Sequence, residues 1–272
     1  DVMRFLTPYK IFGSHLIETH VLAFEVYFRK GKLLLQWQSL KRSFRLCSPS
    51  SQHYPTLLRQ AALFLSHLNT NLAQMSESIR HVMRQELPSL NVFGVEATSN
   101  GGDGKTDVDV LSKLPSTEAF IAKYLSPKSQ SFQIRVEHLK VKHFLASQAS
   151  LSRSDDVTKV KHDASEYIES TLASLVDDID TLAELTLESG LALYNAVKSN
   201  AFGEVSAQNV ERLRQKLSSL YPFASRFMLD NEVLLFEKEL ADSDYFTAET
   251  EEYAAANTPT TTPNCNETDL AE

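Results

Sequence analysis

The longest regular pattern of apolar positions lies between residues 56 and 87. Apolar side chains recur there at spacings of three and four, which places them on one stripe of an α-helix. The members of this stripe are Leu58, Ala61, Leu65, Leu68, Leu72, Met75, Ile79 and Val82. Pro55 and Thr56 offer a helix start, and Pro88 cannot continue a helix. The pattern predicts one helix over residues 56–87, whose stripe needs partner helices to cover it.

A second stripe of the same kind predicts another long helix over residues 163–199. Its members are Ile168, Leu172, Leu175, Ile179 and Leu182. Shorter helical patterns lie in four further stretches: residues 117–125, 134–145, 210–220 and 224–240. These patterns predict a mainly α protein. We expect an antiparallel bundle of four to six helices, closed within one chain, with the two long helices at its centre.

The N-terminal segment, residues 1–55, allows two interpretations. Alternating apolar and polar residues predict a short β-hairpin near residues 20–40. Leu33, Trp37 and Leu40, however, follow helical spacing, and a single glycine within a helical pattern costs little. One or two helices are the preferred interpretation, and the hairpin is the alternative.

Composition divides the rest of the chain into two parts. Residues 56–242 hold the predicted bundle, interrupted by a polar, glycine-rich stretch that predicts a flexible loop at about residues 96–115. Residues 243–272 are rich in acidic residues, Ala, Thr and Pro, a composition that predicts a disordered tail.

The charge of the chain is unevenly distributed. The formal net charge is −8, yet residues 1–50 carry eight Lys or Arg and only three acidic residues. Binding to the phosphate backbone rests on clustered positive charge, so an acidic chain predicts no general nucleic-acid partner. The basic segment remains the predicted interaction surface for a protein partner. Its candidate residues are Trp37, Lys41, Arg42 and Arg45.

Neither a disulfide framework nor a membrane span is predicted. Cys47 and Cys265 are the two cysteines of the sequence, so one bridge between them is left open. The most apolar early segment, residues 11–28, contains ionisable residues that a transmembrane helix would exclude. Because the chain begins at Asp1, we expect a processed product or a fragment, and the compartment is not predicted. Asn266 begins an N-glycosylation sequence.

No catalytic, cofactor-binding or metal-binding site is predicted. The run at residues 101–106 resembles the end of a phosphate-binding loop, but Ser99 stands where the first glycine of that loop is required. The run Asp177–Asp180 resembles part of a magnesium-binding Asp-Asp-x-x-Asp motif, but Thr181 replaces its last acid. We interpret those acids as a solvated helix face. The histidines lack the Glu-x-x-His spacing of di-iron bundles, and no Ser or Cys sits in a recognisable nucleophile motif.

One local resemblance points to a known family. Ile79-Arg80, Leu87-Pro88 and the run Asn91–Val95 resemble the helix end and activation loop of the ring-forming 11S proteasome activators. The resemblance implies a helical bundle that assembles into a ring. It covers a short stretch, and no functional residue is carried over from it.

The sequence therefore favours a non-enzymatic interaction or scaffold protein, a subunit of a larger protein assembly. Two alternatives stay open at this point. An extracellular or surface-anchored ectodomain would explain the Thr/Pro-rich tail and the sequence at Asn266. A proteasome-activator-like ring is the third. The oligomeric state is not predicted.

Overall fold

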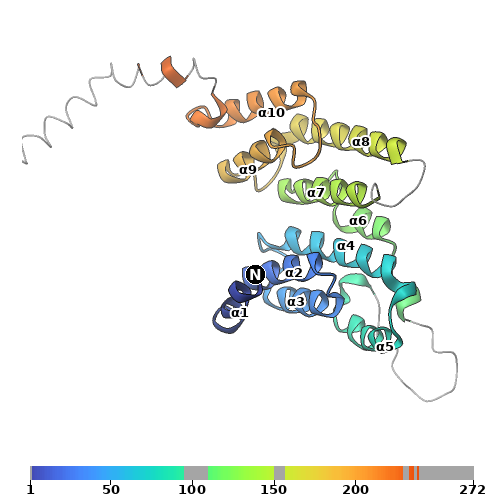
Figure 1. Cartoon of the computed structure of the whole chain (residues 1–272). Helices are drawn as coiled ribbons and strands as arrows, with labels where there is room; N and C mark the ends of the chain where they lie inside the picture. The colour runs from blue at the N-terminus through green and yellow to red at the C-terminus, as the bar shows by residue number, and fades with distance from the viewer. Residues whose placement is uncertain (1, 95–109, 150–156, 229–232, 236–237, 239–272) are drawn as a thin grey trace, which may run out of the picture. The chain divides into compact units, whose positions relative to one another are not determined.

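The computed structural model describes residues 2–94, 110–149, 157–228, 233–235 and 238, and it is mainly helical. Within those residues it contains helices, turns and two isolated β-bridges, but no strand. The α-helices are α1 (Val2–Phe12), α2 (Ile17–Arg29), α3 (Leu33–Leu46), α4 (Tyr54–Asn71), α5 (Glu77–Glu86), α6 (Thr117–Tyr124), α7 (Phe132–Ala149), α8 (Val157–Asp178), α9 (Leu187–Lys198) and α10 (Ala207–Leu220) (Figure 1). The predicted α class is confirmed.

The β-hairpin considered near residues 20–40 is not found, because these residues form α2 and α3. Gly31 joins the two helices with φ +62°, in the left-handed region that glycine adopts readily. The amide of Gly31 donates to the Phe28 carbonyl and the amide of Lys32 donates to the Tyr27 carbonyl. This pair of bonds is the Schellman ending of a helix. Helical burial of Ala23 and Tyr27 outweighs the strand-like alternation of this segment.

The predicted helix over residues 56–87 is broken into α4 and α5. A 3₁₀ turn, Leu72–Gln74, follows α4, and Met75 and Ser76 are extended with ψ of 139° and 150°. The Asn71 side chain donates to the His67 carbonyl, and such local bonds compete with the continuing helix. The stripe is buried through Leu68. The prediction was therefore right for the first half of the stripe and wrong for one continuous helix.

The segment that follows α5 contributes two side chains to the hydrophobic core. Two 3₁₀ turns, Leu87–Ser89 and Asn91–Phe93, place Leu87 and Phe93 in the core. Most of the loop predicted at residues 96–115 lies outside the described residues. Its end does not behave as a flexible loop, because Val110–Lys113 forms a 3₁₀ turn whose first two side chains are buried.

The helices α7 and α8 lie against each other and are tied at their ends. Arg135 near the start of α7 contacts Asp178 at the end of α8, 2.8 Å from nitrogen to oxygen. The Ala183 amide donates to the Gln130 carbonyl and the Phe132 amide donates to the Ala183 carbonyl. Because the start of α7 meets the end of α8, the two helices are antiparallel.

The predicted helix over residues 163–199 is also broken, between α8 and α9. The 3₁₀ turn Ile179–Thr181 ends α8, and Glu184 adopts φ +67°. Thr186 then begins α9 with a capping box, in which its side chain accepts from the Ser189 amide while the Ser189 side chain accepts from the Thr186 amide. All five apolar residues of the predicted stripe up to Leu182 are buried. The stripe was predicted correctly and the helix end was not.

One hydrophobic cluster joins the helices from α2 to α7. Its buried members are Phe24, Leu33, Trp37, Leu40, Leu58, Ala61, Ala62, Phe64, Leu65, Leu68, Met83, Leu87, Phe93, Val110, Leu111, Phe120, Ile121, Leu125 and Val141. A smaller cluster of Leu6, Ala23, Val26 and Tyr27 holds α1 on α2. The segment of residues 1–55 thus contributes to the same core as the helices that follow it.

The predicted closed bundle is not confirmed. The main helix contacts join α1 to α2, α2 to α3, α3 to α4, α4 to α6 and α7, and α7 to α8. The two helices expected at the bundle centre, α4 and α8, are therefore linked through α7. Contacts between neighbours along the chain are typical of stacked helical pairs.

The contacts divide the chain into two units, Asp1–Lys216 and Leu217–Glu272. In the second unit the 3₁₀ turn Ser225–Phe227 is described, with the Phe227 ring 6.5 Å from that of Tyr221. Most of the helix predicted at 224–240, and the tail 243–272, lie outside the described residues. Within the described part of the chain, no helix is both long enough and apolar enough to cross a membrane.

Candidate interaction groove

Three helices of the first unit meet at a cluster of charges with the buried Glu137 at its centre. Arg59 of α4 lies between Glu25 of α2 and Glu137 of α7, with nitrogen-to-oxygen distances of 2.9 and 2.7 Å. Glu137 is only 1% exposed, so its charge depends on these partners. Lys140, one turn along α7, contacts the other oxygen of Glu137 at 2.7 Å. Two cations and two carboxylates therefore balance one another inside the helix junction.

Gln60, next to Arg59, fixes the same junction from within α4. Its side-chain nitrogen donates to the Val21 carbonyl at 3.0 Å and to the Glu25 carboxylate at 3.3 Å. A buried amide that bonds both backbone and carboxylate orients its neighbours. The ion cluster is thereby positioned by α2 and α4 together.

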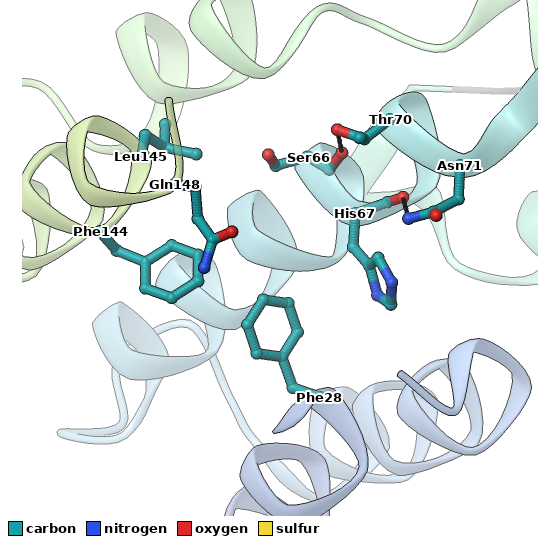
Figure 2. Close-up of a pocket in the computed structure, with 8 residues that line it drawn as sticks. All are labelled: Phe28, Ser66, His67, Thr70, Asn71, Phe144, Leu145 and Gln148. Carbon is teal, nitrogen blue, oxygen red and sulfur yellow. Dashed lines mark hydrogen bonds between the residues drawn. The ribbon is translucent and has the colours of Figure 1, made fainter. Parts of the chain in front are cut away.

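A groove opens beside this cluster, with Phe28 of α2 and Phe144 of α7 at its centre. Their ring centroids lie 5.4 Å apart, and both rings are partly exposed. One hollow, of 530 Å³, is lined by Phe28, Ser66, His67, Thr70, Asn71, Phe144, Leu145 and Gln148 (Figure 2). A second hollow, of 460 Å³, shares Phe28, Phe144 and Gln148 with the first and is bordered by the ion cluster. We call the two joined hollows the α4–α7 groove.

Neutral polar side chains line one wall of the α4–α7 groove. Thr70 donates to the Ser66 carbonyl at 2.9 Å and Asn71 donates to the His67 carbonyl at 2.8 Å, so both side chains are held against α4. His67 Nδ1 lies 3.1 Å from the side-chain oxygen of Gln36 and donates to it. Burial lowers the pKa of His67 from its ordinary value, which favours a neutral ring at neutral pH.

A third hollow, of 440 Å³, adjoins the groove at His143. It lies between α7, α8 and the loop that contains Phe202 and Gly203, and small residues such as Ala164 line it. Burial lowers the pKa of His143 as well. The C-terminal half of α7, from Lys140 to Gln148, thus borders these hollows.

His138, also on α7, is a structural histidine. Its Nδ1 lies 2.5 Å from the Leu125 carbonyl and donates to it, so Nε2 accepts from the Tyr167 hydroxyl at 2.9 Å. Burial is the main cause of the lowered pKa of His138, and the bond to Leu125 opposes it. The ring joins α7 to α8 and to the residue that follows α6.

The groove combines partly exposed aromatic rings with neutral polar side chains, which is a lining suited to binding. Among the described residues, no three His, Cys, Asp or Glu side chains lie together as metal ligands. The acids of the Asp177–Asp180 run contact cations instead: Asp177 contacts Arg212, Asp178 contacts Arg135 and Asp180 contacts Lys216. They are half-exposed inter-helix contacts.

The four residues predicted as an interaction surface lie in different settings, although Lys41 and Arg45 both act on Glu86 and lower the pKa of its carboxyl. Trp37 is 3% exposed and packs against Phe64 and Phe93, because it belongs to the buried stripe of α3. It is therefore not part of an exposed surface. Lys41 contacts Glu86 at 2.6 Å, and this bond lowers the pKa of the Glu86 carboxyl. Arg42 and Arg45 are exposed. Asn266 and Cys265 lie outside the described residues.

The groove residues were missed because they come from helices that are distant in sequence. Phe28, Arg59 and Glu137 carry no shared motif, and their meeting depends on the pairing of α4 with α7. A partial signal exists in Glu137 and Lys140, which interrupt the apolar pattern of α7 at a spacing of three. That signal indicates an ion pair and does not indicate a groove.

Comparison with known proteins relates most of the chain to one kind of subunit. The human protein named N-alpha-acetyltransferase 16, NatA auxiliary subunit, is 27% identical over 228 residues. The chain is similar to an auxiliary subunit. The mouse protein of the same name is 36% identical over 92 residues, which is 34% of this chain and 10% of the mouse protein. No protein-family model matches the chain.

The similarity extends over a small part of the relative. The match to the human protein covers 84% of this chain but 21% of the human protein. This chain therefore spans about a fifth of that relative's length. The similarity to a subunit of a complex agrees with the expectation of a chain that works within a larger assembly.

Proposed function

We propose that this protein is a non-catalytic subunit of an N-alpha-acetyltransferase assembly. The observation that carries the proposal is the similarity of 84% of the chain to the human NatA auxiliary subunit. The mainly helical architecture supports it, because packed helical pairs present broad surfaces to partner chains. The protein partners are then the acetyltransferase and other subunits of that assembly.

The test is purification of the full tagged chain from its native source, followed by identification of its companions. We expect an acetyltransferase subunit in stoichiometric amount, and transfer of acetyl groups to the α-amino group of test peptides by the purified complex. The same chain produced alone is expected to be inactive in that assay. A chain that acetylates peptides by itself would be an enzyme. A chain that purifies without any acetyltransferase would end the proposal.

A further inference from the structure

The wall of the α4–α7 groove holds polar groups with unused hydrogen-bonding capacity. No described residue bonds the Ser66 hydroxyl or the Gln148 amide, and Asn71 uses only its nitrogen, toward the His67 carbonyl. The Nδ1 of His67 is occupied by Gln36, which leaves Nε2 of the neutral ring as an acceptor. An amide side chain offers both a donor and an acceptor. This is the pair of groups that each peptide unit of an extended chain also presents.

The larger hollow carries no full charge, which bears on the kind of partner it fits. None of the residues that line the 530 Å³ hollow carries a full charge when His67 is neutral. In the adjoining hollow, Arg59 and Lys140 are paired with Glu25 and Glu137, and the exposed Arg29 is the remaining charged group of the lining. A strongly acidic or basic segment would therefore meet no matching charge in the larger hollow. Moving an uncharged segment from water into this hollow would cost less free energy than moving a charged one.

The two aromatic rings supply an anchoring position. Phe28 and Phe144 are partly exposed, their ring centroids lie 5.4 Å apart, and both rings line the larger hollow together with the polar side chains (Figure 2). An apolar side chain that enters between the wall and these rings removes apolar surface from water on both partners. A few well-packed anchors of this kind, surrounded by contacts that exclude water, carry most of the affinity of protein interfaces.

We propose that the α4–α7 groove binds an extended, uncharged segment of a partner polypeptide. An apolar side chain of that segment packs against Phe28 and Phe144, and its peptide groups bond to Asn71 and Gln148. The proposal goes beyond membership of an acetyltransferase assembly, since it concerns the chemistry of the bound segment and not the identity of the protein that supplies it.

The test uses the full chain and a displayed library of random twelve-residue peptides. The library is first depleted on the variant Ser66→Arg, which places a cation in the larger hollow, and is then selected on the unchanged chain. A labelled peptide of the most enriched sequence is titrated by fluorescence anisotropy. The binding variants are Gln148→Leu and Asn71→Leu, and the matched control is Gln38→Leu, an exposed amide on α3.

We expect enriched peptides that share an apolar position and lack net charge. Their affinity should fall by about tenfold for Gln148→Leu, which removes bonds to peptide groups, and should stay unchanged for Gln38→Leu. Gln148 lies on α7 and its side chain is exposed, so Gln148→Leu is not expected to change the stability of the fold.

Three results would overturn the proposal. The first is that no peptide is enriched. The second is equal affinity for the unchanged chain and Gln148→Leu. The third is a set of acidic peptides whose binding is lost with Arg29→Ala, which would assign the surface to acidic partners. The experiment contains no acetyltransferase, so its failure would not contradict the proposed function. Failure to purify an acetyltransferase with the chain would likewise not contradict peptide binding in the groove.

Discussion

Glu137 shows how much a single side chain can depend on its neighbours in this fold. Its carboxylate is almost fully buried, and two cations, Arg59 and Lys140, come from two different helices to meet it. Removing a carboxylate from water is costly, and only charged partners at short distance repay that cost. The residue therefore couples α4 and α7 more specifically than apolar contacts do.

The variant Glu137→Gln is expected to lower the free energy of unfolding by about 2–4 kcal/mol, because it leaves the Arg59 guanidinium with one carboxylate fewer in a buried place. Urea unfolding followed by circular dichroism measures the change. The matched control is Glu118→Gln, which breaks the exposed contact to Lys142 and should cost less than about 1 kcal/mol. Equal losses for the two variants would show that burial does not strengthen the contact.

Stability is expected to fall in mild acid because of His138. Burial places the pKa of His138 below the ordinary value of 6.5. Between the two pKa values, His138 is therefore protonated in the unfolded chain and neutral in the folded protein. The contribution is fully present above about pH 6.5 and declines as the pH falls below it. His67 and His143 act in the same direction.

Thermal unfolding between pH 8 and pH 5.5 tests this dependence. The variant His138→Gln removes one titrating group and should show a shallower decline of Tm with falling pH than the unchanged chain. His81→Gln, at an exposed position of α5, should retain the original decline. A decline that is identical in all three proteins would assign the acid sensitivity to other groups.

At the scale of elements, the apolar stripes were predictable and the helix ends were not. The burial of Leu58 and Leu65, and of Leu172 and Leu175, follows directly from spacing. The helix ends after Asn71 and after Asp178 were missed because apolar residues continue at helical spacing across each of them. Local signals were present nonetheless. Ser76 precedes Glu77, and Thr186 begins a capping box, both of which are typical of helix starts.

The break after α4 has a direct test in one pair of substitutions. In a single helix over residues 56–87, Leu68 and Val82 would lie on the same buried stripe. In the structure Leu68 is 0% exposed and Val82 is 38% exposed. Leu68→Asp is expected to remove the cooperative thermal transition, because it buries an unpaired charge at a cost of several kcal/mol. Val82→Asp should keep the transition within a few degrees of the original Tm. Similar losses for both would support the unbroken helix.

The groove lay beyond single-sequence prediction for a physical reason. Periodicity reports which face of a helix is buried, but it does not report which other helix covers that face. Phe28, Arg59 and Phe144 become neighbours only once α4 pairs with α7. Trp37 illustrates the same limit, since an aromatic residue beside a basic run fits an interaction surface and a core position equally until its partners are known.

For the molecule as a whole, the helices α2 and α3 are part of the main core. Phe24, Trp37 and Leu40 share one cluster with Leu65 and Val141. A chain that lacks residues 1–55 is therefore expected to lose its cooperative thermal transition, because it exposes the apolar faces that α2 and α3 cover. Differential scanning calorimetry of the full and shortened chains measures this. A sharp transition in the shortened chain, with an unchanged helical signal per residue, would establish an independent domain after residue 55.

The order of helix contacts has a consequence for how the polypeptide folds as it is made. Several helices of the first unit, such as α2, α3, α4 and α8, pack on the helix just before them in the chain. Such a helix can pack soon after it has been made. Contacts between segments close in sequence also form fast. The contacts of α4 with α6 and with α7 are exceptions. The contact of Arg59 with Glu25 can form as soon as α4 has been made. Its contact with Glu137 can form only after α5, α6 and α7 have been made. Until α7 has been made, the face of α4 that α7 covers in the finished fold is exposed to solvent.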